Sequence, residues 1–109
     1  KTLGVKLIMI LGHENCGAIK TAIQAYEEKS YNELSENFQS ILNHIYPAIE
    51  EVECKDDDFL NSAVRANITY QLRDLFKKDL YIAKAVESGD IAMVGAMYSL
   101  SKGTVEILN

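Results

Sequence analysis

The feature that most constrains the fold lies near the start of the chain, where a short apolar run meets a glycine-bounded turn and then a helix. Residues 5–11 are apolar except for one lysine. A run of this length predicts a strand buried on both faces, as in a parallel sheet covered by helices. Residues 12–17 follow at once, with Gly12 and Gly17 at their ends, and predict a tight turn. Residues 18–28 then carry apolar side chains at helical spacing.

A second helix is expected where a start signal precedes an apolar stripe. Ser30 with Glu33 three residues later fits a capping box, so we expect this helix to begin near residue 31. The stripe consists of Leu34, Phe38, Ile41, Leu42 and Ile45. Pro47 should end or kink the helix near residue 46, because proline has no amide hydrogen and clashes with the preceding turn.

The rest of the chain predicts two helices and two strands. The helix at residues 59–78 should be the longest and best packed, and the helix at 80–88 should end at a glycine. Strands are expected at residues 91–100 and 104–108. The residues between them, 101–103, have the length and the glycine of a hairpin turn. The pattern as a whole is that of an α/β chain.

Composition argues against several classes of protein and several kinds of partner. The 109 residues are 48% hydrophobic and carry a formal net charge of −5, which is too apolar for a disordered segment. The negative balance argues against binding to nucleic acid or to anionic lipid, since both need clustered cations. The longest apolar run, Leu7 to Leu11, falls well short of the roughly 18–20 residues of a spanning helix. Two cysteines cannot make a disulfide scaffold and predict a cytoplasmic protein.

His13 and Cys16 in the predicted turn suggest a metal site. An imidazole and a thiolate three residues apart can reach one ion if the backbone bends between them, and this ligand pair is typical of zinc. The carboxyl end of a strand is also where open α/β sheets bind ligands. Because zinc sites have three or four ligands, the spacing alone leaves open that His13 and Cys16 are ordinary loop residues.

Other interpretations of this turn are weaker. Gly12 and Gly17 have the spacing of a phosphate loop, but Ala18 and Ile19 stand where lysine and serine or threonine are required. The middle glycine of a dinucleotide fingerprint is missing. Cys16 at the start of a helix could act as a nucleophile, but no base is evident beside it.

Residues 11–18, Leu-Gly-His-Glu-Asn-Cys-Gly-Ala, closely resemble the second zinc-binding motif of the β-class carbonic anhydrases, Gly-His-x-x-Cys-Gly-Ala. Weaker resemblances follow in the family's order. Residues 63–67 are similar to its long helix, and residues 94–105 to its closing hairpin. Ile45 with Pro47 and Ala48 fits a segment of some bacterial members. The resemblance extends through essentially the whole chain. It implies the C-terminal part of a β-carbonic anhydrase-like fold, a mainly parallel sheet with flanking helices and a C-terminal hairpin.

The resemblance implies a zinc enzyme that interconverts carbon dioxide and bicarbonate through attack by a zinc-bound hydroxide. In the family, one histidine and two cysteines hold the zinc, with water or an aspartate in the fourth place. His13 and Cys16 match two of these ligands, and Gly17 matches backbone next to the substrate. The resemblance implies Zn²⁺ as the cofactor, no further catalytic residue in this chain, and a homodimer or larger homo-oligomer.

One departure from the family limits what this chain can do alone. The remaining ligands belong to an earlier Cys-x-Asp-x-Arg motif, which does not occur in residues 1–109. Cys54 follows the site in an acidic loop and is expected to be a solvent-side thiol. We therefore expect residues 1–109 to be a single, N-terminally truncated domain, inactive alone, from a parent enzyme with carbonate dehydratase activity. The alternative is a non-catalytic α/β interaction or regulatory domain that keeps two ligands.

Several other residues have simpler explanations than a site. His44 next to an apolar stripe is expected to be a packed or half-exposed structural residue. The aspartates at 56–58 suit the start of the next helix better than calcium, because the loop lacks the alternating ligands of an EF-hand. The six tyrosines show no evident cluster. Met93 and Met97 are expected in the core.

Overall fold

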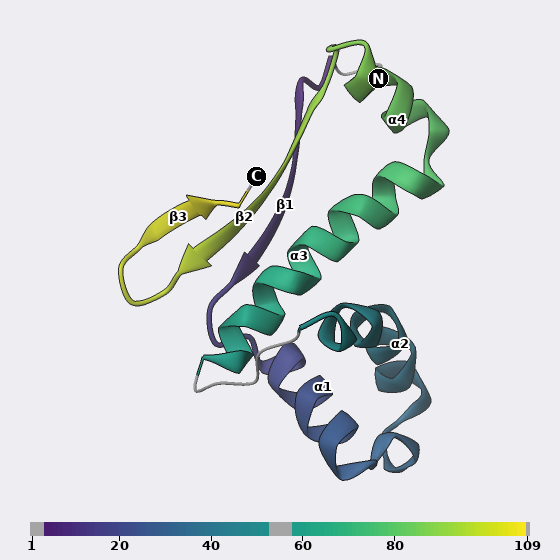
Figure 1. Ribbon diagram of the computed structural model, residues 1–109, viewed down its shortest axis with the longest axis vertical. Coiled ribbons are helices and arrows are strands. Elements are labelled where there is room, and N and C mark those ends of the chain that lie inside the picture. Colours follow the sequence, from purple (N-terminus) through teal and green to yellow (C-terminus); the bar gives the residue numbers. More distant parts are fainter. Residues whose placement is uncertain (1–3, 53–57, 109) are drawn as a thin grey trace. The chain divides into compact units, whose positions relative to one another are not determined.

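The computed structural model describes residues 4–52 and 58–108 and is shown in Figure 1. The elements are, in order, β1 (Leu7–His13), α1 (Gly17–Glu28), a 3-10 turn (Tyr31–Glu33), α2 (Glu36–Glu50), α3 (Phe59–Lys78), α4 (Leu80–Glu87), β2 (Ala92–Ser99) and β3 (Thr104–Ile107). They fall into two compact units. The sheet unit is Lys1–His13 with Ile68–Asn109, and the helical unit is Glu14–Asn67. Helix α3 has residues in both.

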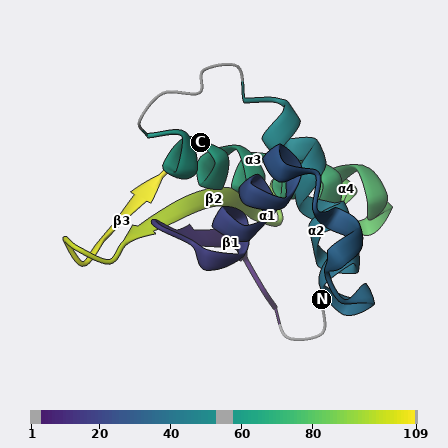
Figure 2. The same ribbon diagram turned by 90° about the horizontal axis from the view of Figure 1, so that it is seen from below.

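The sheet combines one parallel and one antiparallel pair of strands. Strand β2 lies between β1 and β3 (Figures 1 and 2). Strand β1 is parallel to β2, with Leu7 opposite Ala92 and His13 opposite Tyr98. Strand β3 is antiparallel to β2. The Gly103 amide donates to the Ser99 carbonyl at 2.8 Å. The parallel pairing of the first strand and the C-terminal hairpin are therefore confirmed.

The prediction that the first strand is buried on both faces is wrong for the described residues. Exposure alternates along β1, and the side chains of Leu7, Met9 and Leu11 are 51%, 40% and 56% exposed. Met93 on β2 lines a groove together with residues of α3 and α4, so these helices lie over one face of the sheet. Leu7, Met9 and Leu11 are on the other face, which we call the open sheet face. An aliphatic run indicates a strand but does not tell how many of its faces are covered.

Helix α2 begins later than the capping-box prediction. Ser30 precedes only a 3-10 turn, and its side chain makes no capping hydrogen bond. The N-cap of α2 is Ser35, whose Oγ accepts a hydrogen bond from the Phe38 amide at 3.2 Å. The Gln39 side-chain amide donates to the carbonyls of Tyr31 and Leu34, at 3.0 and 3.1 Å. These bonds hold the 3-10 turn against the first turn of α2.

Pro47 was predicted to end or kink the second helix, and the first of these two outcomes is wrong. Helix α2 continues through Pro47 to Glu50. Ala48 and Ile49 beyond the proline are 0% and 2% exposed. Burial of this last turn offsets the lost hydrogen bond, because a proline deprives only one carbonyl of its partner.

We expect Ser35→Ala to destabilise the protein by about 1 kcal/mol, because the Phe38 amide loses its acceptor. Ser30→Ala is the matched control and should change the free energy of unfolding by less than about 0.5 kcal/mol. Urea denaturation of the two variants measures both values. An equal loss of unfolding free energy in Ser35→Ala and Ser30→Ala would contradict the assignment of Ser35 as the N-cap.

The bounds of the other helices are close to those predicted. Helix α3 has the predicted bounds, but the expectation that it is the best-packed helix is wrong, because α2 has more buried residues. Helix α4 ends at Glu87, two residues before Gly89, whose φ is 84°. Asp79 caps α4 by accepting from the Ile82 amide at 3.1 Å. At the start of α3, Asp58 pairs with Arg65 at 3.8 Å, whereas Asp56 and Asp57 lie outside the described residues. No helix within the described ranges has the length and apolar character needed to span a membrane.

Each unit has its own buried hydrophobic residues. In the helical unit these come from the first three helices: Ile19, Ala22, Ala25, Leu42, Ile45, Ala48, Ile49, Ala63 and Val64. In the sheet unit they are Ile68, Ala83, Ala96 and Met97. Met97 is thus in the core as predicted, whereas Met93 is half-buried at a groove.

The tyrosines do form a cluster, contrary to the sequence-based expectation. The ring of Tyr46 lies 5.7 Å from that of Tyr26 and 5.8 Å from that of Tyr31, measured between centroids. The Tyr46 hydroxyl is buried and has no hydrogen-bond partner among the described residues. Burial, and to a lesser extent Tyr31, raises the pKa of Tyr46. Tyr46 is 15 or more residues from the other two in sequence, so its contact with them depends on the fold.

We expect Tyr46→Phe to stabilise the protein by about 1 kcal/mol at neutral pH, because it removes an unsatisfied buried hydroxyl. The unfolded tyrosine loses its proton near pH 10, whereas the folded protein retains it to higher pH. Stability should therefore fall as the pH rises above about 10, and less steeply in Tyr46→Phe.

The matched control is Tyr31→Phe, which removes the hydrogen bond to Asn43 Oδ1. It should destabilise the protein by about 0.5 kcal/mol. Urea denaturation between pH 7 and 11 tests both variants, and a destabilising Tyr46→Phe would contradict the assignment.

Candidate metal centre

His13 is the last residue of β1 and sits at the carboxyl end of the parallel pair. It is opposite Tyr98 of β2, and its side chain is exposed. The register puts it on the open sheet face with Leu11, two residues earlier. The sequence analysis placed His13 in the turn after a strand ending at Leu11. The strand instead extends two residues further, so that His13 is its last residue.

Cys16 is the N-cap residue of α1. Its φ and ψ, −61° and 123°, are extended, and its carbonyl accepts from the Lys20 amide at 3.0 Å. The side chain is half-buried, is a free thiol, and makes no capping hydrogen bond to the helix. The sulfur is thus not engaged by the first turn of α1.

The backbone between these two residues bends at Asn15 and not at the flanking glycines. Asn15 has a φ of 56°, in the left-handed region that asparagine tolerates better than most residues. Gly12 and Gly17 have no positive φ. The Asn15 amide donates to Oδ1 of Asn61, on α3, at 3.0 Å. Sequence reasoning missed Asn61, because it lies 46 residues away and carries no local signal.

Gly17 is the first residue of α1, and a Cβ at this position would meet no described atom within 4 Å. Packing among the described residues therefore does not require a glycine here. The backbone at Gly17 is exposed.

The described residues supply two candidate zinc ligands. The unit boundary falls between His13 and Glu14, so His13 belongs to the sheet unit and Cys16 to the helical unit. No group of three or more histidine, cysteine, aspartate or glutamate side chains within residues 4–52 and 58–108 could hold a metal ion. Cys54 lies outside the described residues, and His44 is exposed on α2. The assignment of His13, Cys16 and Gly17 stays a prediction.

Comparison with known proteins identifies the family. The family model described as "Carbonic anhydrase" matches residues 1–105. The chain belongs to the β-carbonic anhydrase family. A carbonic anhydrase of Mycolicibacterium smegmatis is 28% identical over 106 residues, which cover 96% of this chain and 50% of that protein. The chain thus spans about half the length of this curated relative.

Two solved structures show the same fold. The β-carbonic anhydrase CcaA matches with a TM-score of 0.83 and 24% identity, over 99% of this chain and 53% of that chain. The β-carbonic anhydrase CafD of the fungus Aspergillus fumigatus matches with a TM-score of 0.69 and 17% identity, over 100% of this chain and 60% of that chain. The α/β fold class of a β-carbonic anhydrase is therefore confirmed, with a small mixed sheet and helices.

Proposed function

We propose that the full protein is a zinc-dependent carbonic anhydrase that hydrates carbon dioxide reversibly to bicarbonate, with His13 and Cys16 as zinc ligands. The observation that carries the proposal is the match of the family model across residues 1–105, together with the Gly-His-x-x-Cys-Gly-Ala motif at residues 12–18. In the structure this motif spans the end of β1 and the start of α1.

The donor set fits zinc in kind. An imidazole and a thiol are the nitrogen and sulfur ligands that zinc prefers. A catalytic zinc takes three protein ligands and keeps one open position. The proposal therefore requires one more ligand, which the family resemblance assigns to an earlier Cys-x-Asp-x-Arg motif that residues 1–109 do not contain. When bound, zinc would supply a nucleophile for carbon dioxide at neutral pH.

The chain's own residues would position these ligands. Pairing with β2 fixes the backbone of His13, and the hydrogen bond from Lys20 fixes that of Cys16 within the first turn of α1. The Asn15–Asn61 hydrogen bond holds the bend before Cys16. The exposed backbone at Gly17 leaves room for carbon dioxide or bicarbonate beside the site.

A homodimer or larger homo-oligomer is part of the proposal. The open sheet face exposes a row of three large apolar side chains, Leu7, Met9 and Leu11. Apolar patches of this kind commonly mark surfaces that association buries.

One specific observation favours a second function, a non-catalytic interaction or regulatory domain. The described residues contain two candidate zinc ligands where three are needed. Under this alternative, the full protein would retain the family fold without binding zinc.

Native mass spectrometry of the full protein, followed by a carbon dioxide hydration assay, separates the two functions. If the full protein is a carbonic anhydrase, the spectrum should show one zinc ion per chain and the assay should detect hydration of carbon dioxide. The same spectrum reports the number of chains in the assembly. A folded protein with neither zinc nor hydration would overturn the enzyme proposal and support the interaction domain.

A further inference from the structure

A groove in the sheet unit is separate from the candidate metal centre. It has a volume of about 280 Å³ and is lined by Leu72, Arg73, Phe76, Lys77, Val86 and Met93. Met93 is paired with Ile8 in the sheet register, whereas His13 is paired with Tyr98. The groove therefore lies toward the opposite end of the β1–β2 pair from His13, between α3, α4 and β2.

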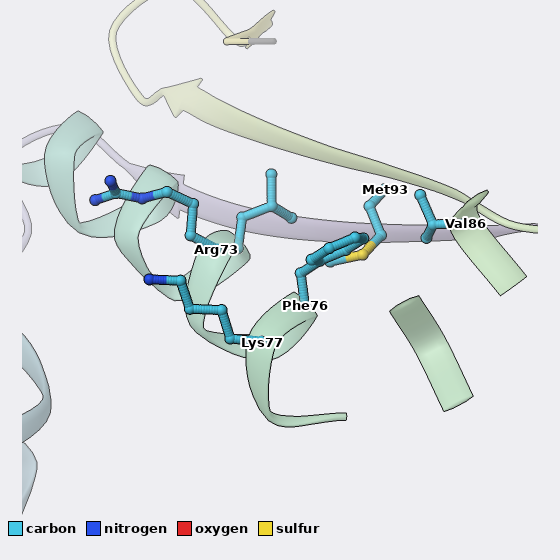
Figure 3. A pocket seen from close by; sticks show the side chains of 6 residues that line it. Arg73, Phe76, Lys77, Val86 and Met93 are labelled. Carbon is cyan, nitrogen blue, oxygen red and sulfur yellow. The ribbon is translucent and has the colours of Figure 1, made fainter. Parts of the chain in front are cut away.

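One end of the groove is apolar. Figure 3 shows Phe76, Val86 and Met93 gathered there, from α3, α4 and β2 respectively. The side chain of Phe76 is 37% exposed, although an aromatic ring contributes a large apolar area when it is buried. A ligand that covered this ring and Met93 would gain the free energy of removing apolar surface from water.

The other end of the groove is cationic. Arg73 and Lys77 are one turn apart on α3, so they share a face of the helix, and Figure 3 shows both side chains extending away from Val86 and Met93. Among the residues that the structure describes, no acidic side chain lines the groove. The neighbouring Lys78 pairs with Asp74 at 3.1 Å, and the Arg73 guanidinium lies 5.8 Å from the centroid of the Tyr70 ring.

A cationic end next to an apolar end in one groove is unusual for an acidic chain. Its formal net charge is −5, yet two cations adjoin an exposed aromatic ring in one concavity. A favourable interaction with the C-terminal end of α3 accounts for a lysine at position 77, but it does not account for an apolar groove beside it. Apolar walls with a few placed charges are characteristic of small-molecule sites.

We propose that this groove binds a small amphipathic monocarboxylate, with the carboxylate toward Arg73 and Lys77 and the apolar body over Phe76 and Met93. The volume of about 280 Å³ is at the lower end of the range of small-molecule sites, about 300–1,000 Å³, and so suits a small ligand of roughly ten non-hydrogen atoms. A ligand of this size in an open groove should bind with a dissociation constant on the order of 1 mM.

The methionines provide a direct test in the full protein. With ¹³C-labelled methionine methyl groups, titration with octanoate should shift the Met93 signal. Met97 is buried in the same strand and Met9 is on the open sheet face, so their signals should not move. A shift of Met9 without one of Met93 would overturn the proposal, because the ligand would then occupy the open sheet face.

Two further probes separate the contributions of charge and apolar surface. The neutral analogue 1-octanol should bind about tenfold more weakly than octanoate, and acetate should not shift Met93 at the same concentration and ionic strength. Equal affinity for octanol would overturn the role of the cations. An equal shift with acetate would overturn the role of the apolar end.

Matched lysine variants test the cationic end. Lys77→Gln should weaken octanoate binding about threefold, because an exposed cation contributes modestly. Lys84→Gln changes an exposed lysine on α4 that does not line the groove, and it should leave the affinity unchanged. Equal weakening in both variants would show a general effect of net charge and would overturn the assignment.

Discussion

Replacing Cys16 with serine should remove zinc from the full protein and abolish carbon dioxide hydration. A neutral hydroxyl is a poor substitute for a thiolate as a zinc ligand, and the affinity of a zinc site depends on deprotonated ligands in the correct number. We expect zinc content below about a tenth of wild type and a hydration rate lowered at least about 1,000-fold, since the metal supplies the nucleophile. Elemental analysis and stopped-flow hydration measure the two quantities. Retention of both would show that Cys16 is not a ligand.

Cys54→Ser is the matched control, because it makes the same change at the other cysteine of the chain. It should leave zinc content and hydration near wild type. A large loss of zinc would show that the third ligand had been assigned to the wrong part of the protein. Misfolding of Cys16→Ser is excluded by comparing metal-free proteins. Cys16 is an N-cap residue, and serine is favoured at that position, so the metal-free variant should be at least as stable as the metal-free wild type.

The parts of the fold that sequence predicted well are those with strong local signals. The bounds of α3 follow from a long run at helical spacing, without glycine or proline. The C-terminal hairpin follows from the glycine at 103 between two strand-like segments; its φ of 68° is one that glycine adopts without strain. The order of strand, turn and helix around the candidate site was predicted correctly, although His13 is the last residue of β1 and not part of the turn.

The parts that sequence did not predict depend on residues distant along the chain. The bend before Cys16 depends on Asn61 of α3, and the tyrosine cluster depends on how α1, the 3-10 turn and α2 pack. Whether one or both faces of β1 are buried depends on how many helices pack against the sheet. A capping box and a proline are local signals, but tertiary packing overrode both in α2. The family motif names two zinc ligands, but local patterns cannot show what completes the site.

Helix α2 also shows how finely packing selects among similar residues. Ile41 and Leu42 are neighbours of nearly equal size, and both belong to the apolar stripe predicted from the sequence. In the structure, Leu42 is 0% exposed and Ile41 is 52% exposed, so the prediction that Ile41 faces the core is wrong. The predicted core face of α2 included one residue too many, because the spacing of apolar residues defines a helix face only to within about one residue.

Leu42→Ala should therefore destabilise the full protein by about 3 kcal/mol, whereas Ile41→Ala should cost less than about 1 kcal/mol. The first variant leaves a cavity among close-packed side chains of the helical unit; the second shortens a side chain that is already half in water. Urea denaturation followed by far-ultraviolet circular dichroism measures both. If the two variants lost the same free energy of unfolding, Ile41 would be covered in the full protein. A larger loss in Ile41→Ala than in Leu42→Ala would reverse the assignment of the core face of α2.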